Sequence, residues 1–103
     1  MRQKICGVFG EIDSLPGCSQ IGVSHSVFCP PELRNEHRAT EANKRRLTFM
    51  KVDYGYDYAL CTVDLENRHQ IKILASNGWR QLSSFISTKT GHSVGLFGRD
   101  LNV

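Results

Sequence analysis

The sequence contains no long hydrophobic run, and this absence argues against a membrane-spanning helix. None of its 103 residues lies in a stretch near the roughly 20 consecutive apolar residues that cross a bilayer. The first ten residues are interrupted by Gly7 and Gly10 and lack the pattern of an export signal. We therefore expect a cytoplasmic location and no membrane partner.

An excess of one sign of charge is missing as well. Lys and Arg number 13 against 10 Asp and Glu, which leaves a formal net charge of +3. A surface that binds long nucleic acid is usually more basic, so this balance argues against a nucleic-acid partner. The most basic stretch, residues 34–46, fits phosphate contacts or a solvated helix face. A small nucleic-acid-binding domain built on this stretch is one hypothesis for the function, and two others follow below.

Paired cysteine motifs are missing. The four cysteines, at positions 6, 18, 29 and 61, form no C-x-x-C pair. The spacing of Cys18, His25 and Cys29 matches no common zinc template. Free thiols in a reducing compartment are the better interpretation. We expect no metal site.

The elements that are present predict one mixed α/β domain over residues 1–103, which is long enough for one core. Apolar periodicity and the placing of Gly and Pro predict the order β-β-α-β-α-β-β. The expected strands are residues 4–12, 19–29, 56–63, 79–87 and 92–97, and the expected helices are residues 40–52 and 66–76.

Residues 31–40 form the most informative segment, because they join a predicted strand to a predicted helix. The first N–H groups of a helix have no partner inside it, and the helix dipole adds partial positive charge there. A tight turn at this place is suited to an anion such as a pyrophosphate. The segment therefore predicts an anion-binding turn.

Three groups of residues together resemble the GNAT family of acyl-CoA-dependent N-acyltransferases, over about residues 21–97. They are Arg34-x-x-His37-x-Ala39 in the turn, the strand region from Tyr54 to Val63, and Asn67 followed by Gln70-Ile71-x-Ile73-Leu74 and Asn77-Gly78-Trp79. The resemblance implies a compact GNAT-like fold with a reduced N-terminal region. It also implies direct acyl transfer from acetyl-CoA to an amine of a protein or small molecule.

The same resemblance implies a set of cofactor-binding residues. In the family, backbone groups of the strand before the turn bind the pantetheine arm, and N–H groups of the turn hold the pyrophosphate. Carried over residue by residue, the expected contacts are Val27, Cys29, Arg34, Asn35, Glu36, His37, Arg38, Ala39, Thr40 and Asn67. Small members often dimerise, so a homodimer through the C-terminal hairpin is an open alternative.

Two residues depart from the family pattern. His37 replaces a glycine of the turn, where its imidazole either obstructs the cofactor or, when protonated, pairs with a phosphate. Leu74 replaces a tyrosine that many members use as general acid. The short N-terminal region leaves the acceptor site undefined.

Acyl transfer to an amine benefits from a general base with a pKa near 7. His25 is the candidate base because it lies in mid-strand, on the same face as Val27. Its alternative role is that of a strand histidine bonded to a neighbour. Tyr58 is the candidate acid that would replace the missing tyrosine, with Tyr54 and Tyr56 beside it. The alternative for all three is ordinary strand packing.

The departures from the pattern also support a second hypothesis. A catalytically degenerate GNAT-fold protein, such as a viral or mobile-element inhibitor, would engage a host macromolecule instead of performing catalysis. A complex that persists after substitution of His37 and Arg38 would distinguish this hypothesis from the acyltransferase.

Overall fold

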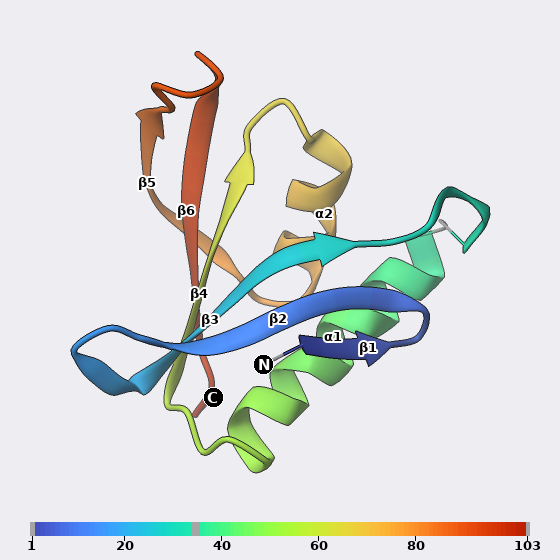
Figure 1. The fold of residues 1–103 in the computed structure, drawn as a ribbon, viewed down its shortest axis with the longest axis vertical. Coiled ribbons are helices and arrows are strands. Elements are labelled where there is room, and N and C mark those ends of the chain that lie inside the picture. The colour runs from blue at the N-terminus through green and yellow to red at the C-terminus, as the bar shows by residue number, and fades with distance from the viewer. Residues whose placement is uncertain (1, 34–35, 103) are drawn as a thin grey trace.

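The structure is a computed structural model that describes residues 2–33 and 36–102. It confirms the mixed α/β class, with one six-stranded sheet in the order β1-β2-β3-β4-β6-β5 and two helices (Figure 1). The strands are β1 (Arg2–Ile5), β2 (Val8–Leu15), β3 (Cys18–Phe28), β4 (Tyr58–Asp64), β5 (Arg80–Ile86) and β6 (Ser93–Asp100), and the helices are α1 (Glu36–Val52) and α2 (Arg68–Ser76).

The N-terminal region is a hairpin, so the expectation of one strand over residues 4–12 is wrong. Ile5 and Val8 pair across a two-residue turn, in which Cys6 has φ 52° and Gly7 has φ 80°. Two positive φ angles in succession are typical of the turn that matches the twist of paired strands. Sequence patterns missed it because cysteine is an unusual first residue for this turn. The next connection, through Pro16-Gly17, agrees with the predicted turn.

Strands β3 and β4 are parallel neighbours that share only a short ladder. Ile21, Gly22 and Val23 pair with Tyr58, Ala59 and Leu60, and no further pairs follow among the described residues. Figure 1 shows the two strands splaying apart toward their C-terminal ends. All other neighbouring strands in the sheet pair antiparallel.

A β-bulge in β3 lies beside the point where the strands separate. Phe9 pairs with Phe28 and Glu11 with His25, so Ser26 and Val27 together stand opposite Gly10. Ser26 has φ 55°, a left-handed conformation that is uncommon for a residue with a Cβ. The bulge therefore bends β3 away from the regular sheet at residues that the sequence places in the candidate site.

Both helices cover one face of the sheet. Met50 of α1 and Leu74 of α2 are fully buried and pack with Ala59, Phe97 and Trp79 in the main core. A smaller cluster forms where Ala42 of α1 meets the β1–β2 hairpin. The other face of the sheet has no helix over it in the described chain. On edge strand β5, Leu82, Phe85 and Ile86 are exposed.

The helices begin at residues other than those predicted. Helix α1 starts at Glu36 instead of Thr40, so His37, Arg38 and Ala39 belong to its first turns. Arg38 stabilises this early start, since its Nη1 donates to the carbonyl oxygen of Cys6 at 2.9 Å. Helix α2 starts at Arg68, two residues later than predicted. No described helix is both long and apolar enough to cross a membrane.

Gly22 offers a test of this packing. A Cβ at this position would collide with the Tyr56 ring and lie 2.8 Å from Met50 Cε. We expect Gly22→Ala to lower the free energy of unfolding by about 1–3 kcal/mol, because both contacts belong to the core. Urea denaturation measures the loss, and Ser19→Ala at an exposed position of the same strand is the control. Equal stability of the two variants would contradict this packing.

Candidate functional site

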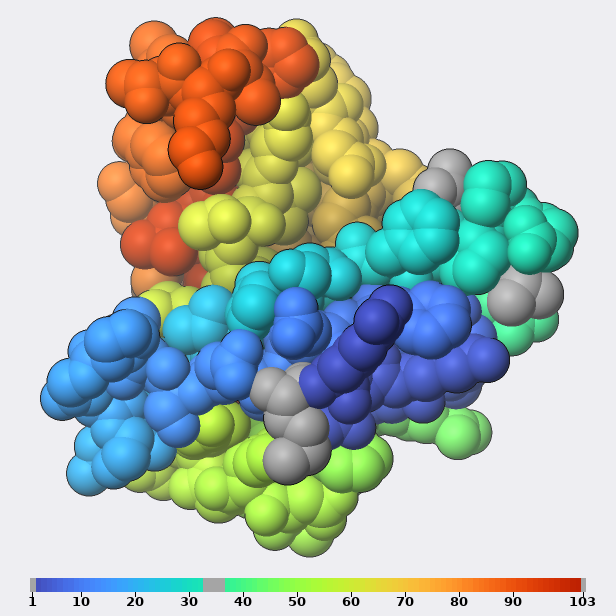
Figure 2. Space-filling model, viewed as in Figure 1, coloured from blue at the N-terminus to red at the C-terminus, as the bar shows by residue number. Residues whose placement is uncertain are grey.

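A cavity of about 540 Å³ lies between the separated ends of β3 and β4 and the two helices. Its walls come from residues 24–29 of β3 and the segment that follows it, residues 61–64 of β4, the inner face of α1, and α2 with its N-cap. Figure 2 shows the matching outline, with the end of β3 standing apart from the lobe of β4, α2, β5 and β6. This volume is in the range of pockets that hold cofactors and small ligands.

The cavity brings together half of the described residues that the sequence assigned to cofactor or catalysis. Its walls include His25, Val27, Cys29, Ala39 and Asn67. His37, Arg38 and Thr40 lie in the first turns of α1 and do not line it. Glu36 is the first residue of that helix, while Arg34 and Asn35 lie outside the described residues. These assignments stay predictions.

His25 is held between two polar side chains. Its Nε2 lies 2.7 Å from Asp13 Oδ2, and its Nδ1 lies 3.0 Å from Ser26 Oγ. The His25 and Asp13 side chains are 40% and 55% exposed, so the pair is in contact with solvent. A carboxylate accepts a hydrogen bond from Nε2–H, which leaves Nδ1 as the acceptor side of the ring, facing the Ser26 hydroxyl. His25 is thus a strand histidine bonded to its neighbours through both ring nitrogens, and its role as a base stays a prediction.

The start of α1 forms the other polar end of the site. His37 is exposed on the first turn, so its imidazole does not fill the cavity. Arg38 is tied to the β1–β2 turn through Cys6, and Asn77 Nδ2 donates to the Thr40 carbonyl oxygen at 3.3 Å. These two bonds fix the helix start against the hairpin and against α2.

The N-terminus of α2 is capped by a predicted site residue. Asn67 Oδ1 accepts from the Gln70 backbone N–H at 3.2 Å. This bond satisfies one of the first-turn donors, which is the usual task of an asparagine at this position. In the last turn of the helix, Leu74 is 1% exposed and lines the cavity. Its side chain supplies no acidic proton there.

Tyr58 lies away from the cavity. It is the first residue of β4 and pairs with Ile21 and Asp100. A Cβ at Gly98 would collide with its hydroxyl, so its ring lies over Gly98 on the sheet face opposite the buried Ala59. The structure does not bring Tyr58 together with His25, although it brings His25 to the cavity.

Three cavity residues were missed by sequence reasoning. Arg46 was assigned to a phosphate-binding or solvated helix face, but the structure buries it at 3% exposure. Asn43 Oδ1 accepts a hydrogen bond from Trp79 Nε1 at 3.0 Å. Burial raises the pKa of the Cys61 thiol to about 12, so this thiol is not a nucleophile near neutral pH. The only available signal was position, since Asn43 and Arg46 share a helix face with Ala39 and Ala42.

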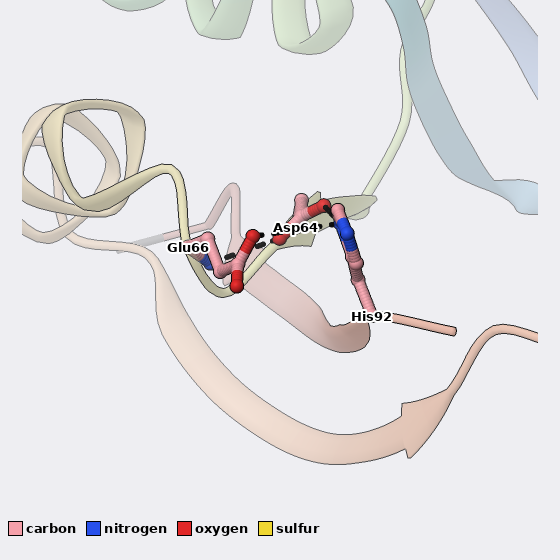
Figure 3. Close-up of side chains that lie close together, drawn as sticks. All are labelled: Asp64, Glu66 and His92. Carbon is pink, nitrogen blue, oxygen red and sulfur yellow. Dashed lines mark hydrogen bonds and ion pairs between the residues drawn. The ribbon is translucent and has the colours of Figure 1, made fainter. Parts of the chain in front are cut away.

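A second polar cluster lies at the end of β4 (Figure 3). Asp64 accepts from the Glu66 backbone N–H at 2.9 Å, and its Oδ2 lies 2.7 Å from His92 Nδ1. The side-chain atoms of Asp64, Glu66 and His92 that could bind a metal ion all lie within 4.8 Å of one another. The hydrogen bond to Asp64, followed by the charges of Glu66 and Asp64, raises the pKa of His92. These contacts describe an exposed ion-paired cluster that ties the β5–β6 hairpin to β4.

Comparison with known proteins identifies the fold. No family model matches the sequence, and no curated protein sequence matches it. Among solved structures, spermidine N-acetyltransferase from Vibrio cholerae in complex with CoA and spermine is similar over 92% of this chain and 58% of its own, with 11% identity and a TM-score of 0.80. The chain has the GNAT fold.

Two further structures with this fold agree. The GNAT-family acetyltransferase from Bacillus anthracis matches 93% of this chain and 59% of its own, with 14% identity and a TM-score of 0.80. A putative phosphinothricin N-acetyltransferase matches 92% and 61%, with 12% identity and a TM-score of 0.79. The chain thus spans about three fifths of the length of these structures, and identity this low shows the fold alone.

The pH dependence of stability tests the Asp64–His92 pair. A raised folded-state pKa means that the stabilisation is complete below the usual histidine value of 6.5 and is lost as the pH rises through the folded-state pKa. We expect His92→Gln to lower the melting temperature more at about pH 5.5 than at about pH 9. Thermal unfolding at both pH values measures this, with Lys89→Gln in the same hairpin as the control. An equal decrease at both values would contradict the pairing.

Proposed function

We propose that this protein is an acyl-CoA-dependent N-acyltransferase that uses acetyl-CoA and transfers the acyl group directly to an amine. The observation that carries this proposal is the cavity between the separated ends of β3 and β4, next to the start of α1, in a GNAT fold. The proposal extends to substrate and mechanism, which similarity at 11–14% identity does not establish.

The chain offers groups that fit the two polar parts of the cofactor. Beyond Val23, the described residues of β3 and β4 form no further pairs, so the amides of a pantetheine arm could bond to the backbone along this edge of β3. Val27 and Cys29 line the cavity along this edge. The pyrophosphate would lie at the first turn of α1, near His37 and Arg38, where helix N–H groups lack internal partners.

His25 is the proposed general base. It lines the cavity, and Asp13 lies 2.7 Å from its Nε2. His25 would take a proton from the amine as the amine nitrogen attacks the thioester carbonyl carbon. A C–N bond forms, the C–S bond breaks, and the departing thiolate takes a proton from solvent, because Leu74 cannot donate one. The pKa of Cys61 argues against a covalent acyl-cysteine at that position.

One observation favours the alternative function. Three large apolar side chains, Leu82, Phe85 and Ile86, are exposed on edge strand β5. Exposed apolar side chains on an unpaired edge suit the binding of a partner. A catalytically degenerate binding protein therefore stays the second candidate, and cofactor binding distinguishes the two.

A titration with acetyl-CoA tests the proposed function. We expect a dissociation constant on the order of 1–100 μM by calorimetry, in the usual range for enzyme substrates. Because His37 is exposed on the first turn of α1 and does not fill the cavity, we expect His37→Gly to weaken binding about threefold or more, since the variant loses an imidazole that can donate a hydrogen bond to a phosphate. Tighter binding by the glycine variant would show obstruction instead. No binding at millimolar cofactor would overturn the acyltransferase.

Measurements of the turnover rate test His25 as the general base. With acetyl-CoA and a panel of polyamines and amino acids, release of the CoA thiol reports acyl transfer. We expect His25→Gln to lower kcat by about 10²-fold or more while acetyl-CoA affinity is kept. Asp13→Asn should lower kcat as well, because it changes the group that orients the His25 ring. Full activity of His25→Gln would remove His25 from the mechanism.

A further inference from the structure

Arg46 lines the cavity in surroundings that do not stabilise its charge in the folded state. Its side chain points inward from α1 and is 3% exposed. Its Nε and Nη2 atoms are buried, and no group in the described chain accepts a hydrogen bond from either. Burial lowers the pKa of the guanidinium, but arginine starts from so high a value that it stays charged near neutral pH.

The sheet makes room for this guanidinium at one position. A Cβ on Gly10 would lie 2.8 Å from Arg46 Nη2 and 2.9 Å from Cζ. Gly10 is also the residue of β2 that faces the bulge of Ser26 and Val27 in β3. The glycine therefore lets the guanidinium lie flat against β2, next to the part of β3 that lines the cavity.

A buried guanidinium in which two nitrogens lack an acceptor among the described residues is unfavourable for the folded state. Moving a charged group out of water costs several kcal/mol unless a counter-charge and hydrogen bonds offset it. A methionine or leucine would fill the same space without this penalty. The position is explained if a ligand in the cavity supplies the acceptor that the described part of the chain does not provide.

A second donor lies one helical turn away on the same face of α1. Asn43 also lines the cavity, and its Oδ1 already accepts from Trp79 Nε1. This bond sets the orientation of the amide, so the remaining hydrogen-bonding group of the side chain is a donor, Nδ2. Guanidinium and amide together form a donor-rich wall that is suited to an anion.

We infer that Arg46 receives a carboxylate of the ligand in this cavity, with Asn43 as the second donor. A carboxylate matches the guanidinium fork and cancels its single charge. A doubly charged phosphate would leave an excess charge, since Arg46 is the only lysine or arginine among the cavity-lining residues that the structure describes. This inference rests on the proposed function and narrows its substrate class.

This carboxylate would belong to one of the two substrates, the acyl donor or the amine acceptor. One is the far end of the acyl chain, as in succinyl-CoA, which would then take the place of acetyl-CoA as the acyl donor. The other is the carboxylate of an amino acid that serves as the amine acceptor. The chemistry at Arg46 is the same in both cases, and the experiment separates them.

The acyl arm compares succinyl-CoA with butyryl-CoA, which has the same chain length without the terminal carboxylate. By calorimetry we expect the wild-type protein to bind succinyl-CoA about tenfold or more tightly than butyryl-CoA, as for a charge-assisted pair. The acceptor arm compares norleucine with pentylamine in the presence of acetyl-CoA. Preference for norleucine in that arm alone assigns the carboxylate to the acceptor.

Variants connect the preference to Arg46. In Arg46→Met and in Gly10→Ala we expect the preference to fall to about one, because the first removes the guanidinium and the second displaces it. Arg45→Met is the matched control, since Arg45 lies on the exposed side of the same helix and pairs with Glu41. It should leave the preference unchanged.

Stability without ligand gives an independent readout. We expect Arg46→Met to raise the melting temperature by about 4 °C or more, because it removes a buried charge without an acceptor. Succinate should raise the melting temperature of the wild-type protein more than succinamide does, and this difference should vanish in Arg46→Met. This arm needs no cofactor, so it still tests Arg46 if no acyl-CoA binds and the proposed function fails. The inference is overturned if the wild-type protein shows no carboxylate preference in any arm, or if Arg46→Met keeps it.

Discussion

The separation of β3 from β4 beyond Val23 is the constraint on which the rest of the site depends. Where two parallel strands stop pairing, they leave a space between them that the side chains of one strand cannot fill. Antiparallel pairing on both sides, of β2 with β3 and of β4 with β6, holds the separated strands in place. The helices then close the space from one face, and the resulting cavity reaches from the buried core to the surface.

The bulge in β3 and the glycine opposite it determine where two polar side chains of the cavity, His25 and Arg46, lie. Ser26 adopts a left-handed conformation there, and its hydroxyl contacts the ring of His25. Gly10 leaves the space that the Arg46 guanidinium occupies. The proposed base His25 and the buried Arg46 thus both lie beside this irregularity. Such local strain and unsatisfied burial are typical of functional sites, where stability is given up for a binding or catalytic arrangement.

The start of α1 and the inner end of the cavity have different characters. The first turn of α1 is open to solvent and carries His37, which suits a mobile, highly charged group such as a pyrophosphate. The inner end has a single guanidinium and an oriented amide among apolar neighbours, which suits a smaller charge. A ligand with both kinds of anion would be held at two separate places. This division follows from the direction of α1, whose start is exposed and whose third turn lies over the core.

The sequence by itself determined the mixed sheet, the order of its main elements, and the neighbourhood of His25, Val27, Cys29 and Asn67, because periodicity and turn residues act locally. Local patterns did not predict the hairpin turn at Cys6, since its conformation is imposed by the pairing of β1 with β2. They also placed Tyr58 near the site, although the side of the sheet that a residue faces depends on register. The burial of Arg46 was decided only by the tertiary structure. A charged side chain in a basic run is expected in solvent, and only the packing of α1 on a strand with Gly10 turns it inward.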